Sequence, residues 1–280
     1  MKKYILVGCA IMVLAICLIA AISIIGQFRF NSAVKREKEI LLAEPKEIPD
    51  MDFEDEMSKL PYPVAKWLLS SGFDGQNYVG AVKLKQKGEL RTAIGKPWLP
   101  MEANQLFVTA QPGFVRDAKI RMAPGIYLNG MDKYSDGKGS MLIKLMSIAN
   151  VVDAKGPEID QGTLLRYLAE TAWFPTAALS EYIEWRPINE KSAMAKMEYG
   201  GIGAEGIFEF NEKGQVVAFS AKRFMENEGE YCLEDWRVVL DGHENMGGFI
   251  VPTRVKVIWE LEEGDFEWFR CEVTEIEYEG

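Results

Sequence analysis

The chain contains few residues whose types and spacing could support catalysis. Its single histidine, His243, is the only imidazole that could act as a general acid or base. It stands among glycine, asparagine and acidic residues between two strand-like segments, which predicts an exposed loop. The sequence has no Gly-x-Ser-x-Gly motif, so it gives no sign of the nucleophile that serine hydrolases use.

Two segments imitate ligand-binding motifs. Residues 201–206 have the glycine spacing of a dinucleotide-binding turn, but strand-like sequence follows where a helix should begin. The segment from Asp132 to Gly137 resembles the start of a calcium loop, but Ile143 occupies the position of the required glutamate. Both segments are better explained as β-hairpins. We therefore expect no cofactor and no metal.

Cys232 and Cys271 are the only cysteines outside the N-terminal apolar segment. Both lie in strand-like sequence, so they could form a disulfide if their strands are neighbours outside the cytoplasm. Two buried free thiols are the alternative. Their wide spacing, with one histidine in the chain, does not fit a zinc site.

Arg166 and Glu170 are the charged pair with the clearest spacing. They stand four residues apart on a predicted helix, so they share one face of it. Two readings are open: an ion pair that orders the helix against the sheet, or a pair that lines a ligand site. A hydrolase that uses carboxylates near this pair is the enzymatic alternative, although no acidic spacing in the chain fixes a catalytic pair.

The first element is an apolar segment from Tyr4 to Gly26 that contains no charged residue. As a helix it would be about 34 Å long, enough to cross a hydrocarbon core of about 30 Å. A secretory signal has an apolar core of only about 7–15 residues, so residues 1–30 predict an uncleaved anchor, although cleavage near Ser23 is an alternative. The sequence around Cys9 matches a lipobox, but it lies too close to the initial lysines.

The direction of this anchor rests on two opposing arguments. More Lys and Arg follow the apolar segment than precede it, which favours a cytoplasmic domain. Long domains, however, cross the membrane largely regardless of charge. We expect a single-pass protein of the bacterial cell membrane, in contact with the bilayer through residues 4–28 and with its C-terminal domain outside the cytoplasm.

The remainder divides into a helical and acidic linker at 31–57 and one β-rich domain at 58–280. A short helix is predicted at 61–71, and a second at 161–172, with Asp160 as its N-cap. Residue alternation and turn signals predict strands on both sides of the second helix. These strands lie at 78–87, 89–95, 101–110, 114–122, 126–134, 138–145, 183–188, 192–199, 204–210, 215–223, 231–240, 250–260 and 266–277.

The predicted fold is α+β but mostly β. An N-terminal transmembrane helix precedes a large curved antiparallel sheet, a half-barrel similar to the lipoprotein-carrier architecture, around an inserted helix. Seven Trp and 13 Met indicate a large apolar interior, either fully packed or open as a lipid-sized cavity. The net charge of −10 and the lack of a basic surface argue against nucleic-acid binding.

The segment from Gly162 to Leu179 resembles an uncharacterised bacterial membrane-associated family, the domain of unknown function number 6544. Further similarity lies at 60–64, 132–141, 185–189, 242–252 and Trp259. Arg116 departs from the family pattern, which favours tryptophan there. The resemblance implies a membrane-associated protein but no activity and no catalytic residues. It singles out Arg166, Glu170 and Trp173, and we add Tyr134 as a further candidate for ligand binding.

We therefore favour a non-enzymatic domain that binds an apolar or lipid-like ligand or an envelope protein. The alternatives are the hydrolase-like enzyme near Arg166 and Glu170, and a purely structural interaction module. The oligomeric state does not follow from the sequence.

Overall fold

The computed structural model describes residues 2–43, 53–227 and 229–280. In these residues one sheet of thirteen strands has the order β6-β5-β4-β3-β2-β1-β13-β12-β11-β10-β9-β8-β7, and every pairing is antiparallel. The bounds are β1 (Ala81–Leu90), β2 (Leu99–Val108), β3 (Gly113–Ala123), β4 (Ile126–Ser135), β5 (Lys138–Leu145), β6 (Ala149–Ala154), β7 (Ile183–Asn189), β8 (Ser192–Tyr199), β9 (Ile202–Phe210), β10 (Val216–Asn227), β11 (Glu230–Met246), β12 (Phe249–Leu261) and β13 (Gly264–Glu279).

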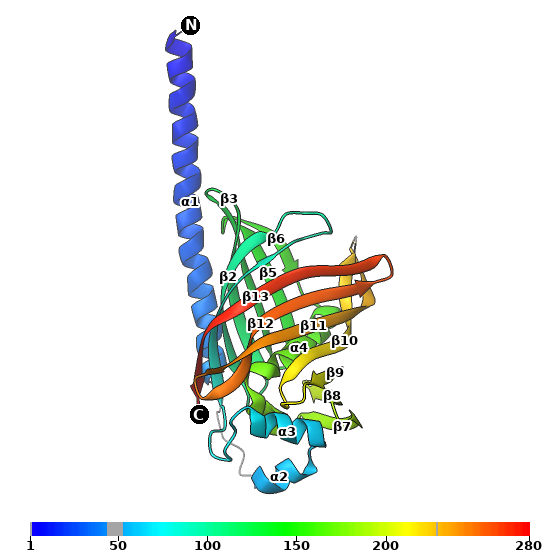
Figure 1. Ribbon diagram of the computed structural model, residues 1–280. Helices are drawn as coiled ribbons and strands as arrows, with labels where there is room; N and C mark the ends of the chain where they lie inside the picture. The colour runs from blue at the N-terminus through cyan, green and yellow to red at the C-terminus, as the bar shows by residue number, and fades with distance from the viewer. Residues whose placement is uncertain (1, 44–52, 228) are drawn as a thin grey trace.

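The sheet curves around the helix α4 (Pro157–Glu170), as Figure 1 shows. The two predicted series of strands join because β13 pairs with β1. Short 3-10 turns η1 (Thr171–Trp173) and η2 (Pro175–Leu179) follow α4, and helices α2 (Phe53–Lys59) and α3 (Tyr62–Ser70) cover one end. The predicted half-barrel around an inserted helix is confirmed.

The strand predictions were wrong at two places. Residues 91–98 do not form the strand expected at 89–95, because β1 ends at Leu90 and the chain turns before β2. Strand β6 was missed altogether. It lies at the edge of the sheet with mostly exposed side chains, so its sequence lacks the apolar alternation that marks a half-buried strand.

Helix α4 begins four residues earlier than predicted, with Gly156 rather than Asp160 in the N-cap position. Asp160 instead has a buried carboxylate that accepts hydrogen bonds from Gly139 N (2.7 Å) and Lys138 Nζ (3.0 Å). These contacts fix the start of α4 against β5.

Two hairpin predictions are confirmed. Asp136 and Gly137 have φ angles of 53° and 75° between the paired strands β4 and β5, the left-handed conformations of a tight hairpin turn. Residues 201–206 lie at the β8–β9 hairpin, where a strand follows the glycines and no helix offers its N-terminus.

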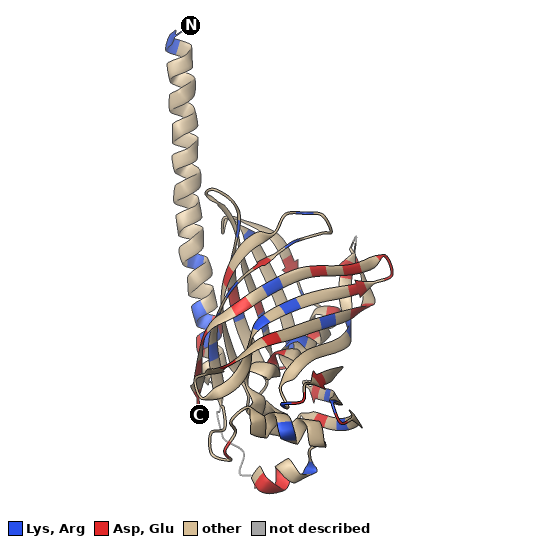
Figure 2. Ribbon diagram, in the orientation of Figure 1, with Lys and Arg blue, Asp and Glu red and all other residues tan. Residues whose placement is uncertain are grey.

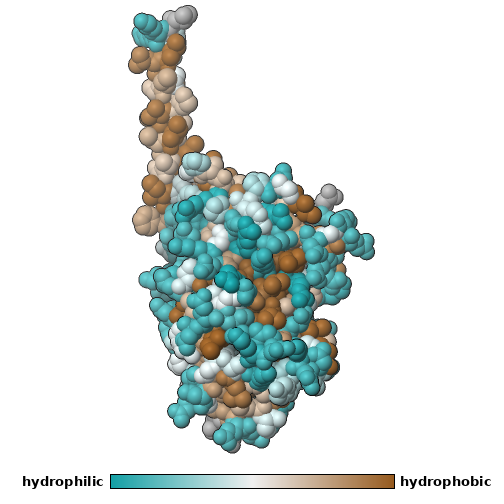
Figure 3. All heavy atoms as spheres, in the orientation of Figure 1, coloured by the Kyte–Doolittle hydropathy of each residue, from teal (hydrophilic) through white to brown (hydrophobic). Residues whose placement is uncertain are grey.

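Helix α1 (Lys2–Ala43) is continuous, and it is long and apolar enough to cross a membrane. Residues 2–22 are exposed along their whole length and project from the domain (Figures 1 and 3). Farther along, Phe30, Val34 and Leu41 are buried against strand residues such as Leu106 and Val115. Of the predicted linker 31–57, residues 44–52 lie outside the described residues.

The sheet is thus covered on two faces near β2 and β3. Phe107 and Phe114 point into the main core with α4, while their neighbours Leu106 and Val115 pack with α1. Acidic and basic residues are interspersed along the strands (Figure 2).

Candidate functional site

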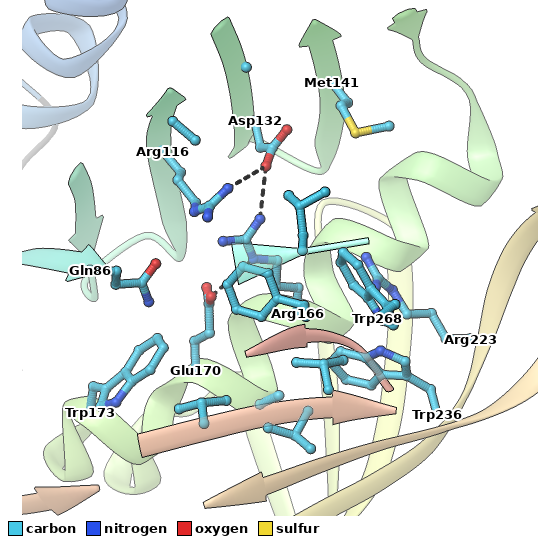
Figure 4. A pocket seen from close by; sticks show the side chains of 18 of the residues that line it. Gln86, Arg116, Asp132, Met141, Arg166, Glu170, Trp173, Arg223, Trp236 and Trp268 are labelled. Atoms are coloured by element: carbon cyan, nitrogen blue, oxygen red, sulfur yellow. Dashed lines mark hydrogen bonds and ion pairs between the residues drawn. The ribbon is translucent and has the colours of Figure 1, made fainter. Parts of the chain in front are cut away.

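Helix α4 brings two kinds of side chain into the concave side of the sheet. Leu164, Leu165 and Leu168 are fully buried and hold the helix in the core. Arg166 and Glu170 come from the same helix and point toward β2, β3 and β4 (Figure 4). The helical spacing that suggested this pair therefore also places it at a sheet surface.

Arg166 is the centre of a closed polar network. Its Nε donates to Glu170 Oε1 (3.0 Å), its Nη1 to Asp132 Oδ2 (3.0 Å) and its Nη2 to Gln105 Oε1 (3.2 Å). Gln105 Nε2 in turn donates to Glu170 Oε2 (2.7 Å). Burial alone would lower the pKa of Arg166, but the charges of Glu170 and Asp132 outweigh it and raise that pKa.

Arg116 is a second buried guanidinium, and it is less well paired. Its Nη1 lies 3.5 Å from Asp132 Oδ2, at the limit of a hydrogen bond, and its Nη2 lies 3.4 Å from Met101 Sδ. Its buried Nε has no partner. Burial, followed by repulsion from Arg166, lowers the pKa of Arg116. Arg116 thus lies inside the site.

Arg223, on β10, is the third guanidinium. Among the described residues it makes no ion pair and no hydrogen bond, and its Nε is buried without a partner. Its guanidinium carbon lies 4.8 Å from the ring centre of Trp236 and 5.9 Å from that of Trp259. Burial, helped by the charge of Arg166, lowers the pKa of Arg223 to about 10, so it remains a cation at neutral pH.

These groups line one cavity between α4 and the sheet, with a volume of about 180 Å³. One water needs roughly 10–15 Å³ of such volume, so the cavity has room for a ligand larger than a few waters. Its wall is mostly apolar, and its polar members include Gln86. The apolar and aromatic lining residues include Leu90, Ile120, Ile143, Trp173, Trp236, Val238, Val257 and Trp268.

Several polar atoms in this wall have no hydrogen-bond partner among the described residues. They are Gln86 Oε1, Arg116 Nε, Arg223 Nε, Trp236 Nε1 and Trp268 Nε1. Buried polar groups are normally hydrogen-bonded, because an unpaired one costs about 1–3 kcal/mol. Four of the five atoms are donors. The cavity therefore presents an excess of donors to whatever occupies it.

The four predicted ligand-binding residues do not all reach this cavity. Arg166, Glu170 and Trp173 line it. Trp173 is also held in place, because its Nε1 donates to Pro252 O (2.9 Å). Tyr134 is fully buried in the core and does not line the cavity, and its hydroxyl lies 3.4 Å from Tyr199 O. Burial raises the pKa of Tyr134.

The strand register rules out the possible disulfide between Cys232 and Cys271. Cys271 lies opposite Val255, which in turn lies opposite Leu240 on β11. Cys232 is eight residues from Leu240 along that strand, on the order of 26 Å at about 3.3 Å per residue, whereas a disulfide needs Cα atoms within about 7 Å. Both thiols are free, with Cys232 exposed and Cys271 buried. Burial raises the pKa of Cys271 to about 12.

The sequence predicted that His243 lies in an exposed loop, and this prediction was wrong. Strand β11 extends to Met246, and His243 pairs with Pro252 of β12. The half-buried imidazole donates from Nε2 to Val216 O (2.8 Å), away from the cavity. The glycines and acids around it made the segment look like a loop, but the backbone pairing continues through them.

Sequence reasoning missed Arg116, Arg223 and the part that Asp132 plays. The alternation of inward and outward side chains along the strands could have identified the two arginines. Arg116 lies on the same strand face as the buried Phe114 and Ala118, and Arg223 on the same face as the buried Phe219. A charged residue at an inward position of a strand is uncommon and marks either an ion pair or a ligand site.

A model described as a family of unknown function, DUF6544, matches residues 52–271. The chain belongs to this family. The match extends from the residue before α2 into β13, and it includes every residue that lines the cavity. The resemblance found in the sequence is confirmed, and the family description assigns no activity. No curated protein matches this DUF6544 chain.

Solved structures share the general shape of this DUF6544 protein at low identity. A domain from Vibrio parahaemolyticus assigned to outer membrane lipoprotein sorting has 7% identity and a TM-score of 0.45, with 80% of this chain and 93% of that chain covered. A LolA superfamily protein from Nitrosomonas europaea has 8% identity and a TM-score of 0.45, with 78% and 94% covered. A β-barrel-like protein of another uncharacterised family, from Brucella abortus, has 9% identity and a TM-score of 0.31, with 72% and 99% covered.

Proposed function

We propose that this DUF6544 protein is a membrane-anchored, non-enzymatic domain that binds an apolar or lipid-like ligand in the cavity between α4 and the sheet. The observation that supports this most directly is the cavity itself. Core side chains such as Tyr167, Phe107 and Phe208 are fully buried, as expected of a close-packed interior. The space beside Trp173, Trp236 and Trp268 is nevertheless open and mostly apolar.

The geometry of α1 supports an anchor beside this cavity. Ser23 Oγ donates to Met146 O (2.8 Å) and is hydrogen-bonded to the Tyr127 hydroxyl (3.0 Å), so the helix first meets the sheet just after the exposed residues 2–22. Those two partners lie next to the β3–β4 and β5–β6 turns. The same turns bear exposed apolar side chains, namely Met122, Ile126, Ile148 and Val151.

This arrangement gives the ligand a short route from the membrane. Ile120 and Ile143 line the cavity, and each lies within a few residues of one of these turns. If residues 4–28 span the bilayer, the turns lie at its surface and the cavity lies just beyond them. We therefore propose that the ligand enters from the bilayer, on the side of the membrane outside the cytoplasm.

The contacts of the acidic residues give little support to the hydrolase alternative. Both oxygens of Glu170 accept hydrogen bonds, from Arg166 and Gln105. Asp132 is shared between Arg166 and Arg116. Carboxylates already engaged by guanidinium and amide donors of the protein are poorly placed to contact the reacting atoms of a substrate. The network is better explained as the scaffold of one cavity wall.

The proposal is tested by native mass spectrometry of the full chain released from its own membranes. We expect a copurifying apolar or amphipathic molecule. The matched variant is Gly130→Leu, because Gly130 lines the cavity and a Cβ there would meet only Ile143 Cγ1 at 3.9 Å. This variant should fold and lose the ligand, because the leucine occupies the space.

The control is Gly203→Leu, in a strand position whose Cβ would meet open space outside the cavity. It should keep the ligand. Wild-type protein without any bound molecule, or equal occupancy in wild type and Gly130→Leu, would contradict ligand binding in this cavity.

A further inference from the structure

The cavity has a charge imbalance that a simple apolar ligand would not correct. Three guanidinium groups line it, from Arg116, Arg166 and Arg223, but only two carboxylates, from Asp132 and Glu170. The lining therefore has a formal charge of +1. An unpaired charge in a largely apolar site is costly, whereas a pair with good geometry recovers much of that cost.

The unpaired charge can be located. Arg166 contacts both carboxylates, and Arg116 shares Asp132 with it. Among the described residues Arg223 has no carboxylate within ion-pair distance, and its guanidinium lies over the rings of Trp236 and Trp259. In Figure 4 the labelled side chains of Arg223 and Trp236 lie on the opposite side of the view from Arg116 and Glu170. The uncompensated cation is Arg223.

The donors near this cation have no hydrogen-bond partner among the residues that the structure describes. Arg223 Nε is buried and unpaired, and so is the indole N–H of Trp236, a residue that is only 4% exposed. Trp268 contributes another unpaired indole N–H to the same cavity. Indole and guanidinium groups can only donate, so they require an acceptor. A single negatively charged acceptor would satisfy both the charge and the hydrogen bonds.

We propose that the ligand is a monoanionic amphiphile whose head group is bound by Arg223 together with the indole N–H of Trp236, while its alkyl chain follows the apolar wall. This assignment rests on the proposed function and specifies the ligand class. The head group is a carboxylate or a phosphate ester, since both accept hydrogen bonds from a guanidinium fork. The rest of the cavity wall, including Val238, Val257 and Ile143, suits an alkyl chain.

The test uses the full chain held in a lipid-free amphipathic polymer at about pH 8, with quenching of tryptophan fluorescence by brominated ligands. All seven Trp lie outside α1, and three of them line the cavity, so quenching reports on that site. Brominated stearate and brominated stearyl alcohol differ only in the head group. The wild type should bind the anion at least about tenfold more tightly, a ratio that corresponds to about 1.4 kcal/mol.

Arg223→Gln should remove this preference for the anion and leave alcohol binding nearly unchanged, and Arg223→Lys should restore part of the preference. The control is Lys222→Gln, which removes the same charge from the adjacent residue. Lys222 is exposed and pairs with Asp235 at 2.9 Å outside the cavity. This variant should bind like the wild type. Brominated phosphatidylglycerol distinguishes a carboxylate head group from a phosphate ester. Only a site for lipid phosphate would bind this phospholipid as tightly as it binds stearate.

The outcomes separate the two proposals. Equal binding of stearate and the alcohol, or a preference that survives Arg223→Gln, would overturn the head-group assignment while leaving the apolar cavity as a binding site. Failure of both alkyl ligands and of the phospholipid to quench the wild type would instead contradict the proposed function itself.

Discussion

At the scale of single residues, three arginines in one cavity have three different roles. Arg166 is paired with two carboxylates and an amide, Arg116 shares one of those carboxylates, and Arg223 has none. The residue type is the same, so the difference comes entirely from the partners that the fold supplies. This difference leads to opposite expectations for two substitutions that remove the same charge.

Arg166→Met should destabilise the protein strongly. It leaves Asp132 and Glu170 buried without their main partner, which costs about 3–5 kcal/mol in comparable sites. Arg223→Met should change the free energy of unfolding by less than about 1 kcal/mol or increase it, because it removes an unpaired cation. Denaturant unfolding of both variants measures this contrast. If Arg223→Met lowered the free energy of unfolding as much as Arg166→Met does, Arg223 would have to form a stabilising ion pair or hydrogen bond within the protein.

His243 predicts a pH dependence of stability. Burial, only partly offset by its hydrogen bond to Val216, lowers the pKa of His243 in the folded protein, while the unfolded chain takes up that proton near pH 6.5. Protonation therefore favours the unfolded state, so stability is complete above about pH 6.5 and declines as the pH falls below it. Because the chain has one histidine, His243→Gln should flatten the decline in Tm between pH 7.5 and 5.5. An unchanged slope would contradict this origin.

At the scale of elements, α1 is both a membrane-length helix and part of the domain. Its first part is exposed, and Ser23, Phe30, Val34 and Leu41 are buried against the sheet. Lys133 Nζ adds an ion pair to Glu37 Oε2 at 2.7 Å. Under the proposed function, this one continuous helix would fix the position of the bilayer relative to that of the cavity.

The contact between α1 and the sheet depends on close approach at Gly26. A Cβ at this position would collide with the carbonyl oxygen of Ser147. Gly26→Leu should therefore lift α1 from the sheet, lowering Tm and increasing hydrogen exchange at Phe30 and Val34, with a cost of about 1–3 kcal/mol. Gly8→Leu is the matched control, because a Cβ there meets nothing within 4 Å. Equal effects of the two substitutions would contradict the docking of α1.

At the scale of the whole molecule, the free cysteines provide a test of orientation. Cys232 is exposed on the domain, whereas Cys271 is buried with its pKa raised to about 12 and is therefore unreactive. If the domain lies outside the cytoplasm, a membrane-impermeant maleimide should label the protein in cells whose outer layers have been removed but whose cell membrane is still closed. Cys232→Ser should abolish that labelling. Labelling only after the membrane is opened would place the domain in the cytoplasm.

The mass of the labelled protein distinguishes an anchor from a cleaved signal. In the folded protein Ser23 is hydrogen-bonded to Met146 within a continuous helix, so we expect the intact mass of the labelled protein to include residues 1–28. A mass that begins near Ser23 would show cleavage.

The sequence by itself determined the elements of this protein. Apolar period, length and turn residues are local properties, so they predicted the N-terminal helix, the insertion helix and twelve of the thirteen described strands, and the motif around Arg166 predicted the family. The misses were local as well: β6 lacks a buried face, and residues 241–246 continue β11 through glycine and acidic residues.

Only the tertiary structure decided which residues share the cavity. Asp132, Arg166 and Arg223 come from β4, α4 and β10, and nothing in their local sequence records that they meet. The register of β11, β12 and β13 likewise separated Cys232 from Cys271. The charge balance of the site is a sum over strands distant in sequence. This charge balance depends on how the sheet curves around α4, because that arrangement supplies no described carboxylate as a partner for Arg223.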